Sequence, residues 1–227
     1  MISIVIPTYN ESAIIGNTLT KLSEITTSQD EIIVVDGSSE DNTREIVREF
    51  SNVILIISPT GRASQMNAGA RIAKRKCILF LHADVQIDEM CLTMLKNQIC
   101  GNGVKWGWFA FTLNSPKFIY RVIEKGANLR NRLTGIPLGD HCIFAMRDIF
   151  DLAGGFPDIP IMEDLEFVKK LNIVTNGIEI KSQVKISVRR FEHSGIIRTL
   201  STMWVIKILY YCGVSPERLA KYYRKIR

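Results

Sequence analysis

The sequence predicts an α/β protein built on a mostly parallel, doubly wound sheet, with amphipathic helices at the C-terminal end. Over the first hundred residues, short runs rich in β-branched residues alternate with helical patterns. These runs are apolar almost throughout, as strands covered on both faces are. Repeated strand–helix–strand units imply parallel strands joined by right-handed crossovers. A chain of 227 residues is long enough for one such domain with its own core.

The first half of the chain supplies four strands and three helices. We expect the strands at Ile2–Ile6, Glu31–Val35, Val53–Ile57 and Cys77–Leu81. The segments between them carry apolar residues at helical spacing, as at Ile15, Leu19 and Leu22 in the first segment. These alternating elements predict a nucleotide-binding half that covers residues 1–104.

The second half has a different pattern. We expect strands at Trp106–Leu113 and His141–Met146, and one or two more within Gly177–Arg190. Helices are predicted at Pro116–Leu133, Met162–Leu171 and Ile196–Tyr211, and a last one begins at Ser215-Pro216-Glu217. Without a repeat or a long linker, the chain is interpreted as one domain over residues 1–195, with an acceptor half at 105–195 and a basic helical appendage at 196–227.

The charge of the chain is unevenly distributed. The net charge is +6, yet residues 181–227 carry 11 basic and 2 acidic side chains, so the rest of the chain is slightly acidic. A basic end favours an anionic partner such as a phosphorylated ligand or a membrane surface. Nucleic acid is not expected, because no nucleic-acid-binding motif accompanies the charge.

Other sequence features indicate a cytoplasmic protein. No uncharged run approaches the roughly 20 apolar residues of a membrane-spanning helix. The N-terminus lacks the basic region and cleavage site of a signal peptide. The five cysteines include no CxxC pair, which is typical of reduced, buried thiols rather than of a zinc site. We therefore expect a cytoplasmic location, with peripheral contact at the inner face of the membrane as a hypothesis.

Polar residues follow each of the four expected strands. Asp36, directly after the second strand, is placed to accept hydrogen bonds from a ribose or a base. Asp84, after the fourth, is placed to bind Mg²⁺ or Mn²⁺, because hard divalent ions combine one or two carboxylates with phosphate oxygens. Ligands of such sheets bind beyond the carboxyl ends of the strands. The absence of a P-loop and of GxGxxG argues against a kinase or a dehydrogenase.

Four strings carry a resemblance to a known family: VIPTYNE, VVDGSSEDNT, LFLHADV and MEDLEF. They resemble the family-2 glycosyltransferases of the GT-A fold, and the similarity runs over essentially the whole chain. The strings LGDHCIF, GGFPDIPIMEDLEF, RRFEHSGIIRTL and GVSPERLAKYYR resemble a bacterial subgroup associated with radical-SAM and selenium-related (selenodomain) gene neighbourhoods. The resemblance implies transfer of a sugar from a nucleoside diphosphate sugar, usually a UDP-sugar, to an acceptor hydroxyl, by a single displacement with inversion.

The resemblance also implies roles for individual residues. Asp164 matches the catalytic base of the family, and Asp84 matches the last acid of its DxD metal motif. The positions that match its donor-binding segments are Pro7, Tyr9, Glu11, Asp36, Arg62, Asn67 and Ala83. The metal motif departs from the family pattern, because His82 stands where its first acid belongs. Asp84 is thus the single clear carboxylate ligand, which puts the need for the metal in question.

Several residues have both a functional and a structural interpretation. Further site candidates are His82, Asp140, Glu163, Arg190 and His193. The aspartates at strand ends are also suited to cap helices, and acids at the start of a helix stabilise its dipole. A histidine at a strand end is often simply packed. Arg190-Phe191 loosely resembles the Arg-Trp of processive family members, but the full QxxRW motif is absent, so processive transfer is not expected.

The basic segments 116–133 and 196–227 are either solvated faces or interfacial helices that bind anionic lipid. A lipid-linked acceptor would suit the second interpretation.

Two other functions compete with glycosyl transfer. A nucleotidyltransferase shares a nucleotide-binding parallel sheet, but its Gly-rich start is missing. A non-catalytic membrane- or partner-binding protein would not need Asp36, Asp84 and Asp164 together.

Overall fold

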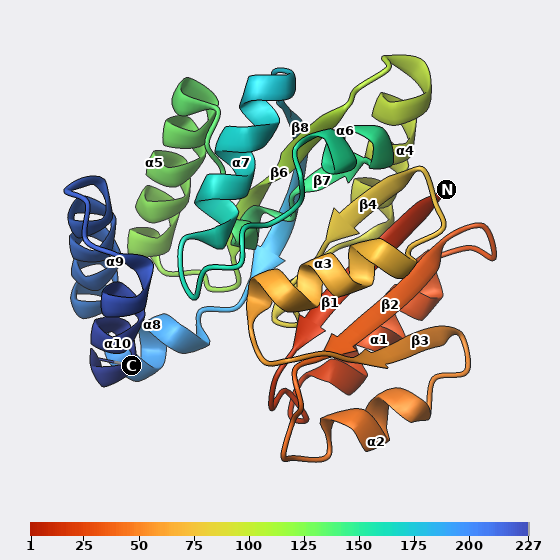
Figure 1. Cartoon of the computed structure of the whole chain (residues 1–227), viewed down its shortest axis with the longest axis horizontal. Coiled ribbons are helices and arrows are strands. Elements are labelled where there is room, and N and C mark those ends of the chain that lie inside the picture. Colours follow the sequence, from red (N-terminus) through yellow and green to blue (C-terminus); the bar gives the residue numbers. More distant parts are fainter. Residues whose placement is uncertain (227) are drawn as a thin grey trace.

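The computed structural model describes residues 1–226, in which a single sheet lies between helices on both faces (Figure 1). The strands are β1 (Ile2–Thr8), β2 (Glu31–Asp36), β3 (Val53–Ile57), β4 (Cys77–Phe80), β5 (Val85–Gln86), β6 (Trp106–Leu113), β7 (Phe144–Met146) and β8 (Ile178–Ile186). The helices are α1 (Ile15–Ile25), α2 (Thr43–Arg48), α3 (Arg62–Ile72), α4 (Glu89–Gly101), α5 (Phe118–Thr134), the 3₁₀ helix η1 (Gly139–His141), α6 (Arg147–Leu152), α7 (Glu163–Val174), α8 (Arg189–Ser194), α9 (Ile196–Tyr211) and α10 (Pro216–Ile226).

The first half of the sheet is parallel, as predicted. The strand order is β3-β2-β1-β4-β7-β6-β8-β5. β1 pairs in parallel with β2 and with β4, and β2 with β3. The chain therefore proceeds in opposite directions from β1, and the carboxyl ends of β1 and β4 flank the position where ligands of such sheets bind.

The second half is mixed. β7 is antiparallel to β4 and β6, whereas β8 is parallel to β6 and antiparallel to β5. The strand predicted at His141–Met146 is shorter, because residues 139–141 form η1 and Cys142 adopts a φ of 50° that interrupts an extended chain. Gly177–Arg190 contains one strand, β8, and its last two residues begin α8.

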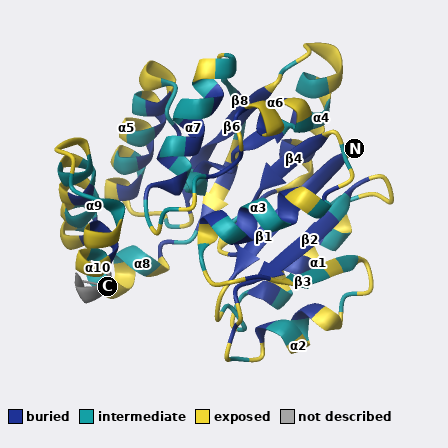
Figure 2. Cartoon of the chain, in the orientation of Figure 1, coloured by how far each residue is buried: buried dark blue, intermediate teal, exposed yellow. Residues whose placement is uncertain are grey.

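Alternating side chains of the strands build one core on each face of the sheet. Ile4, Ile6 and Leu79 pack with α1 and α4, and Val5 and Ile33 pack with α3, α6 and α7. Figure 2 shows the central strands as the most deeply buried part of the molecule. β3 is different, because it lies at one edge of the sheet. The prediction that it is buried on both faces was wrong, since Ile57 is 56% exposed.

Helix α3 lies unusually close to the sheet. A Cβ at Gly69 would be 2.3 Å from Val5 Cγ1 and 2.9 Å from Val35 Cγ2, so only glycine fits between α3 and the strands. At the start of the same helix, Gln65 Nε2 donates to the carbonyls of Thr8 (2.7 Å) and Val35 (2.8 Å). These contacts fix the N-terminus of α3 over the ends of β1 and β2.

The C-terminal helices lie beside α5, at the far side of the molecule from the N-terminus (Figure 1). Ile206 of α9 joins a small apolar cluster with Met162 and Leu165 at the start of α7. The predicted appendage thus packs on the end of the domain that carries Asp164, and residue 227 lies outside the described residues. None of the helices described in residues 1–226 is long and apolar enough to cross a membrane.

Candidate active site

Residues with strained backbone conformations lie next to the predicted site segments. Within the described part of the chain, the non-glycine residues with positive φ are Asn10, Ser38, Cys142 and Met162, at 50–68°. Each lies within two residues of a predicted site residue: Glu11, Asp36, Asp140 and Glu163, respectively. Such conformations cost about 1–3 kcal/mol each and cluster at functional sites. They support a site made from these loops.

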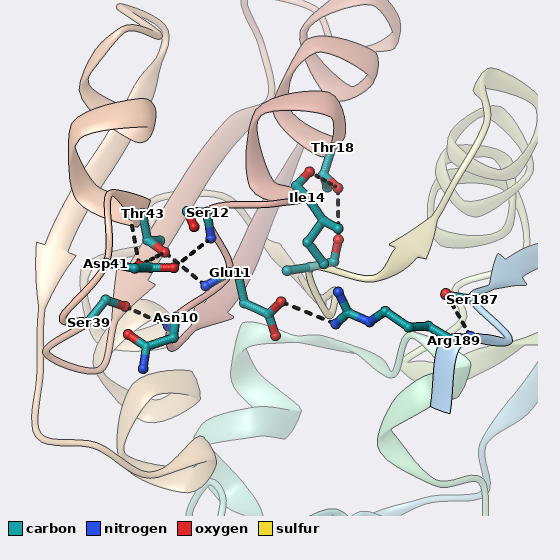
Figure 3. A network of polar contacts seen from close by, with 11 residues as sticks. Asn10, Glu11, Ser12, Ile14, Thr18, Ser39, Asp41, Thr43, Ser187 and Arg189 are labelled. Atoms are coloured by element: carbon teal, nitrogen blue, oxygen red, sulfur yellow. Dashed lines mark hydrogen bonds and ion pairs between the residues drawn. The ribbon is translucent and has the colours of Figure 1, made fainter. Parts of the chain in front are cut away.

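The loops after β1 and β2 are locked together by hydrogen bonds (Figure 3). Asp41 accepts from Ser12 N (3.0 Å) and from Thr43 N (3.0 Å), and Glu11 N donates to Thr43 Oγ1 (2.8 Å). Desolvation would raise the pKa of Asp41, but the hydrogen bonds from Ser12 and Thr43 hold it well below its usual range. The Glu11 carboxylate also faces the Arg189 guanidinium at 3.6 Å, which links the first loop to α8.

Asp36 ends β2 as predicted, but its side chain is wholly buried. Its two oxygens both accept from Ser39 N, at 3.1 and 2.7 Å. Pro7 is buried within β1, and Tyr9 beyond the end of β1 is 44% exposed. Asp36 therefore shapes the turn after β2 in this structure, while Tyr9 is open to solvent.

Asn67 has a structural partner on both sides of its amide. Its Nδ2 donates to Phe156 O (2.8 Å), and its Oδ1 accepts from Phe156 N (2.9 Å). These bonds hold the segment before α7 against α3. In this structure the amide of Asn67 positions this segment, and its contact with the donor stays a prediction.

Arg62, His82, Gly139 and Asp164 converge from four distant segments. A Cβ at Gly139 would be 2.8 Å from His82 Nε2 and 3.4 Å from Asp164 Oδ2, so both side chains flank this glycine. Asp164 Oδ2 accepts from Gly139 N (2.6 Å) and Oδ1 accepts from Leu165 N (2.7 Å). The carboxylate is thereby fixed at the N-terminus of α7, where the helix dipole favours negative charge.

Charges within this cluster act on one another. Desolvation alone would lower the pKa of Arg62, but Glu163, Asp140 and Asp164 outweigh it and raise that pKa. Burial and the charge of Asp164 raise the pKa of Glu163 to about 7. Burial and Arg62 lower the pKa of His82. The cluster therefore combines a permanent cation with carboxylates, one of which is poised to hold a proton near neutral pH.

Asp84 lies at the exposed end of the loop after β4, and Ala83 beside it is buried. Among the described residues, no group of three or more His, Cys, Asp or Glu side chains is arranged to hold a metal by itself. A single exposed carboxylate fits a hard divalent ion that takes its other ligands from phosphate oxygens and water. The site thus fits a cation that binds together with a diphosphate.

The two remaining site candidates, Arg190 and His193, lie in different surroundings. Arg190 lies with its guanidinium 5.1 Å from the centre of the Tyr223 ring and lines the pocket described next. His193 is exposed on α8 and is not among the residues that line this pocket, so the structure does not bring it to the cluster.

A pocket of about 250 Å³ adjoins Asp164. Its polar lining includes Arg62, Asp140, Glu163, Asp164 and Arg190. Its apolar lining comes mainly from β6, α5 and α9 and includes Phe111, Leu113, Ile123, Met203, Trp204 and Ile206. Sequence reasoning missed two cations in the lining, Arg130 and Lys207, because on amphipathic helices they look like solvated charges.

A comparison with known protein families identifies the chain. Residues 3–150 match the profile of glycosyl transferase family 2. The chain belongs to this family. The narrower resemblance to a subgroup of radical-SAM and selenium-related neighbourhoods stays a prediction.

Curated relatives align over part of their length. Validoxylamine A glucosyltransferase of Streptomyces hygroscopicus subsp. jinggangensis is 36% identical over 93 residues, which is 37% of this chain and 22% of that protein. Glycosyltransferase AglE of Haloferax volcanii is 32% identical over 111 residues, 45% of this chain and 36% of that protein. An uncharacterized glycosyltransferase of Haemophilus influenzae is 33% identical over 186 residues, 75% of this chain and 62% of that protein. Each match thus spans less than two thirds of the relative.

Solved structures share the fold. S. aureus TarS 1–349 superposes with a TM-score of 0.66 at 19% identity, over 82% of this chain and 60% of that one. The mannosyltransferase PcManGT of Pyrobaculum calidifontis, in complex with GDP-Man and Mn²⁺, gives a TM-score of 0.69 at 19% identity, over 99% and 69% of the two chains. The fold is therefore the predicted GT-A fold.

Proposed function

We propose that this protein transfers a glycosyl unit from a UDP-sugar to the hydroxyl of a lipophilic acceptor, with inversion at the anomeric carbon. One observation carries the proposal: His82, after β4, and Asp164, at the start of α7, flank Gly139, and Arg62 of α3 is close enough for its charge to act on both and lines the same pocket as Asp164. The nucleotide choice follows TarS, which has been solved with UDP and with UDP-GlcNAc.

In this mechanism Asp164 is the general base. The acceptor oxygen attacks the anomeric carbon, the bond from that carbon to the diphosphate oxygen breaks, and the acceptor proton moves to an oxygen of Asp164. Its hydrogen bonds to Gly139 N and Leu165 N hold the carboxylate in one orientation. A positioned base of this kind contributes about 10²–10⁴-fold to the rate.

The negative charge that develops on the leaving diphosphate needs positive partners. Arg62, at the N-terminus of α3, is a permanent cation next to the cluster. Asp84 would hold a divalent cation, Mg²⁺ or Mn²⁺, which when bound neutralises phosphate charge. His82 replaces a second carboxylate, so we expect the cation to bind tightly only when the diphosphate supplies further ligands.

Residues around the central cluster arrange the donor. Tyr9 is open to solvent at the end of β1, where a base can stack, and Asp36 and Glu11 hold the turns around it. Asn67 positions the segment at Phe156. Glu163 and Asp140 set the charge around Asp164 and Arg62.

The test compares Asp164→Asn with Asp84→Asn. Asp164→Asn should lower transfer at least about 10²-fold while UDP binding, measured by calorimetry with Mn²⁺, stays within about twofold, because the base acts only in the chemical step. Asp84→Asn should instead weaken UDP binding and remove its dependence on Mn²⁺. Equal loss of UDP binding in both variants, or no binding of UDP by the wild type, would contradict the proposal.

A further inference from the structure

Two cations of the pocket, Arg130 and Lys207, have no acidic side chain in ion-pair contact among the described residues. Arg130 lies on α5 and Lys207 on α9, and both side chains are half-buried in the lining. Neither takes part in an ion pair within 4.0 Å among the described side chains. Within residues 1–226, the guanidinium of Arg130 donates to the neutral Asn131 Oδ1, at 2.7 Å from Nη2 and 3.2 Å from Nε.

These two charges disfavour one another. Burial and the charge of Arg130 lower the pKa of Lys207 to about 8, although Asp164 acts in the opposite direction. Burial also lowers the pKa of Arg130. Asp164 is not a close partner, because no ion pair within 4.0 Å joins it to either cation among the described residues. Unpaired charges next to apolar walls are costly unless a ligand compensates them.

The surrounding walls are apolar. Near the two cations the lining includes Ala127, Leu138, Met203 and Ile206, and the pocket continues to Phe111 and Ile123. A small inorganic anion would leave this apolar surface in contact with water. A purely apolar molecule would leave the cations without a counter-charge. A molecule that has both an acidic group and an apolar body satisfies both parts of the lining.

We propose that Arg130 and Lys207 bind an acidic group of the acceptor, a phosphate or a carboxylate, next to the base Asp164. The acceptor is then an anionic amphiphile whose apolar part lies along Phe111 and Ile123 and whose hydroxyl faces Asp164. This inference rests on the proposed function, because it assigns the pocket to the acceptor. It goes further by giving the acceptor a charge and two residues that recognise it.

The experiment measures binding of n-dodecyl phosphate below its micellar concentration to the full chain, by calorimetry. Inorganic phosphate and n-dodecyl-β-maltoside are the comparison probes. Dodecyl phosphate should bind at least about tenfold more tightly than the uncharged amphiphile, because it makes charge-assisted hydrogen bonds. Inorganic phosphate should compete with it only at about 100-fold higher concentration, because it lacks the apolar part.

The variant Arg130→Gln/Lys207→Met should lower the affinity for dodecyl phosphate at least about tenfold and leave the affinity for the maltoside unchanged. Lys125→Met is the matched control, since Lys125 is exposed on the same helix and does not line the pocket; it should change neither. Melting temperatures of all variants establish folding, and we expect no loss in the double variant, because it removes a repulsion.

Several outcomes would overturn the inference. Equal affinity for the charged and the uncharged amphiphile would show that the two cations do not bind the acidic group. Equal affinity for inorganic and dodecyl phosphate would show that the apolar lining does not contribute to binding. A parallel loss of UDP binding in the double variant would assign the cations to the donor. Failure of the proposed function is a separate result: the wild type would not bind UDP, whatever its affinity for dodecyl phosphate.

Discussion

Glu163 and His141 are buried near the pocket, and burial shifts their pKa values in opposite directions. The pKa of Glu163 is raised to about 7 by burial and by Asp164, so the folded protein retains a proton that the unfolded chain releases near 4.5. The pKa of His141 is lowered to about 4, mainly by burial, so the folded protein excludes a proton that the unfolded chain binds. Between about pH 4.5 and 6.5 the two effects on stability oppose each other.

The variant Glu163→Gln separates the effect of Glu163 on stability from that of His141. For Glu163 the folded pKa lies above the unfolded value, so its ionisation destabilises the wild type progressively as the pH rises from 4.5 to above 7. Glutamine carries no such cost. We therefore expect Glu163→Gln to melt several degrees above the wild type at pH 8, on the order of 1–3 kcal/mol, and at nearly the same temperature at pH 4.5. The same difference at both pH values would contradict this assignment.

At the scale of the elements, the close approach of α3 to β1 and β2 places Arg62. The contact depends on the absence of a side chain at Gly69, and Gln65 anchors the start of the helix to Thr8 and Val35. Because Arg62 is the first residue of α3, a displacement of the helix would also move its guanidinium. The geometry of the site is therefore coupled to the packing of one helix.

Gly69→Ala tests this packing against Gly126→Ala. The new Cβ at position 69 would overlap Val5 and Val35, so we expect a loss of about 1–3 kcal/mol or more in the free energy of unfolding. Gly126 lies on the exposed side of α5 and has no atom within 4 Å of its would-be Cβ, so alanine there should stabilise by about 0.5–1 kcal/mol. Urea denaturation measures both. A stable Gly69→Ala protein would show that α3 can move without cost.

At the scale of the whole molecule, basic charge and apolar surface coincide at the C-terminal helices. On α9, Ile197 is 85% exposed, Trp204 58% and Ile208 56%, while Arg218 and Lys221 are exposed on the adjacent α10. An amphipathic surface with cations binds anionic membranes through apolar insertion and charge together. We propose that this end of the molecule contacts the membrane, beside the pocket that would receive a lipophilic acceptor.

Co-sedimentation with vesicles tests the contact. The double variant Ile197→Ser/Ile208→Ser should reduce binding to anionic vesicles at least about tenfold, since each apolar side chain contributes about 1.5–3 kcal/mol when buried. The control is Ile173→Ser, because Ile173 is also 85% exposed but lies on α7. Neutral vesicles should bind the wild type less. Equal losses in the two isoleucine variants, or no binding by the wild type, would refute the membrane contact.

The sequence by itself determined the central strands, with Asp36 at the end of β2 and Asp84 in the loop after β4, because β-branched runs and the polar residues that end them are local signals. Its motifs also identified the family. Tertiary structure alone decided which partners these side chains have: Asn67 bonds to a residue 89 positions away, and Asp36 is buried against its own turn. It also decided the mixed order of the second half of the sheet and the juxtaposition of Arg130 with Lys207. Such contacts depend on the packing of distant elements, which periodicity along the chain does not encode.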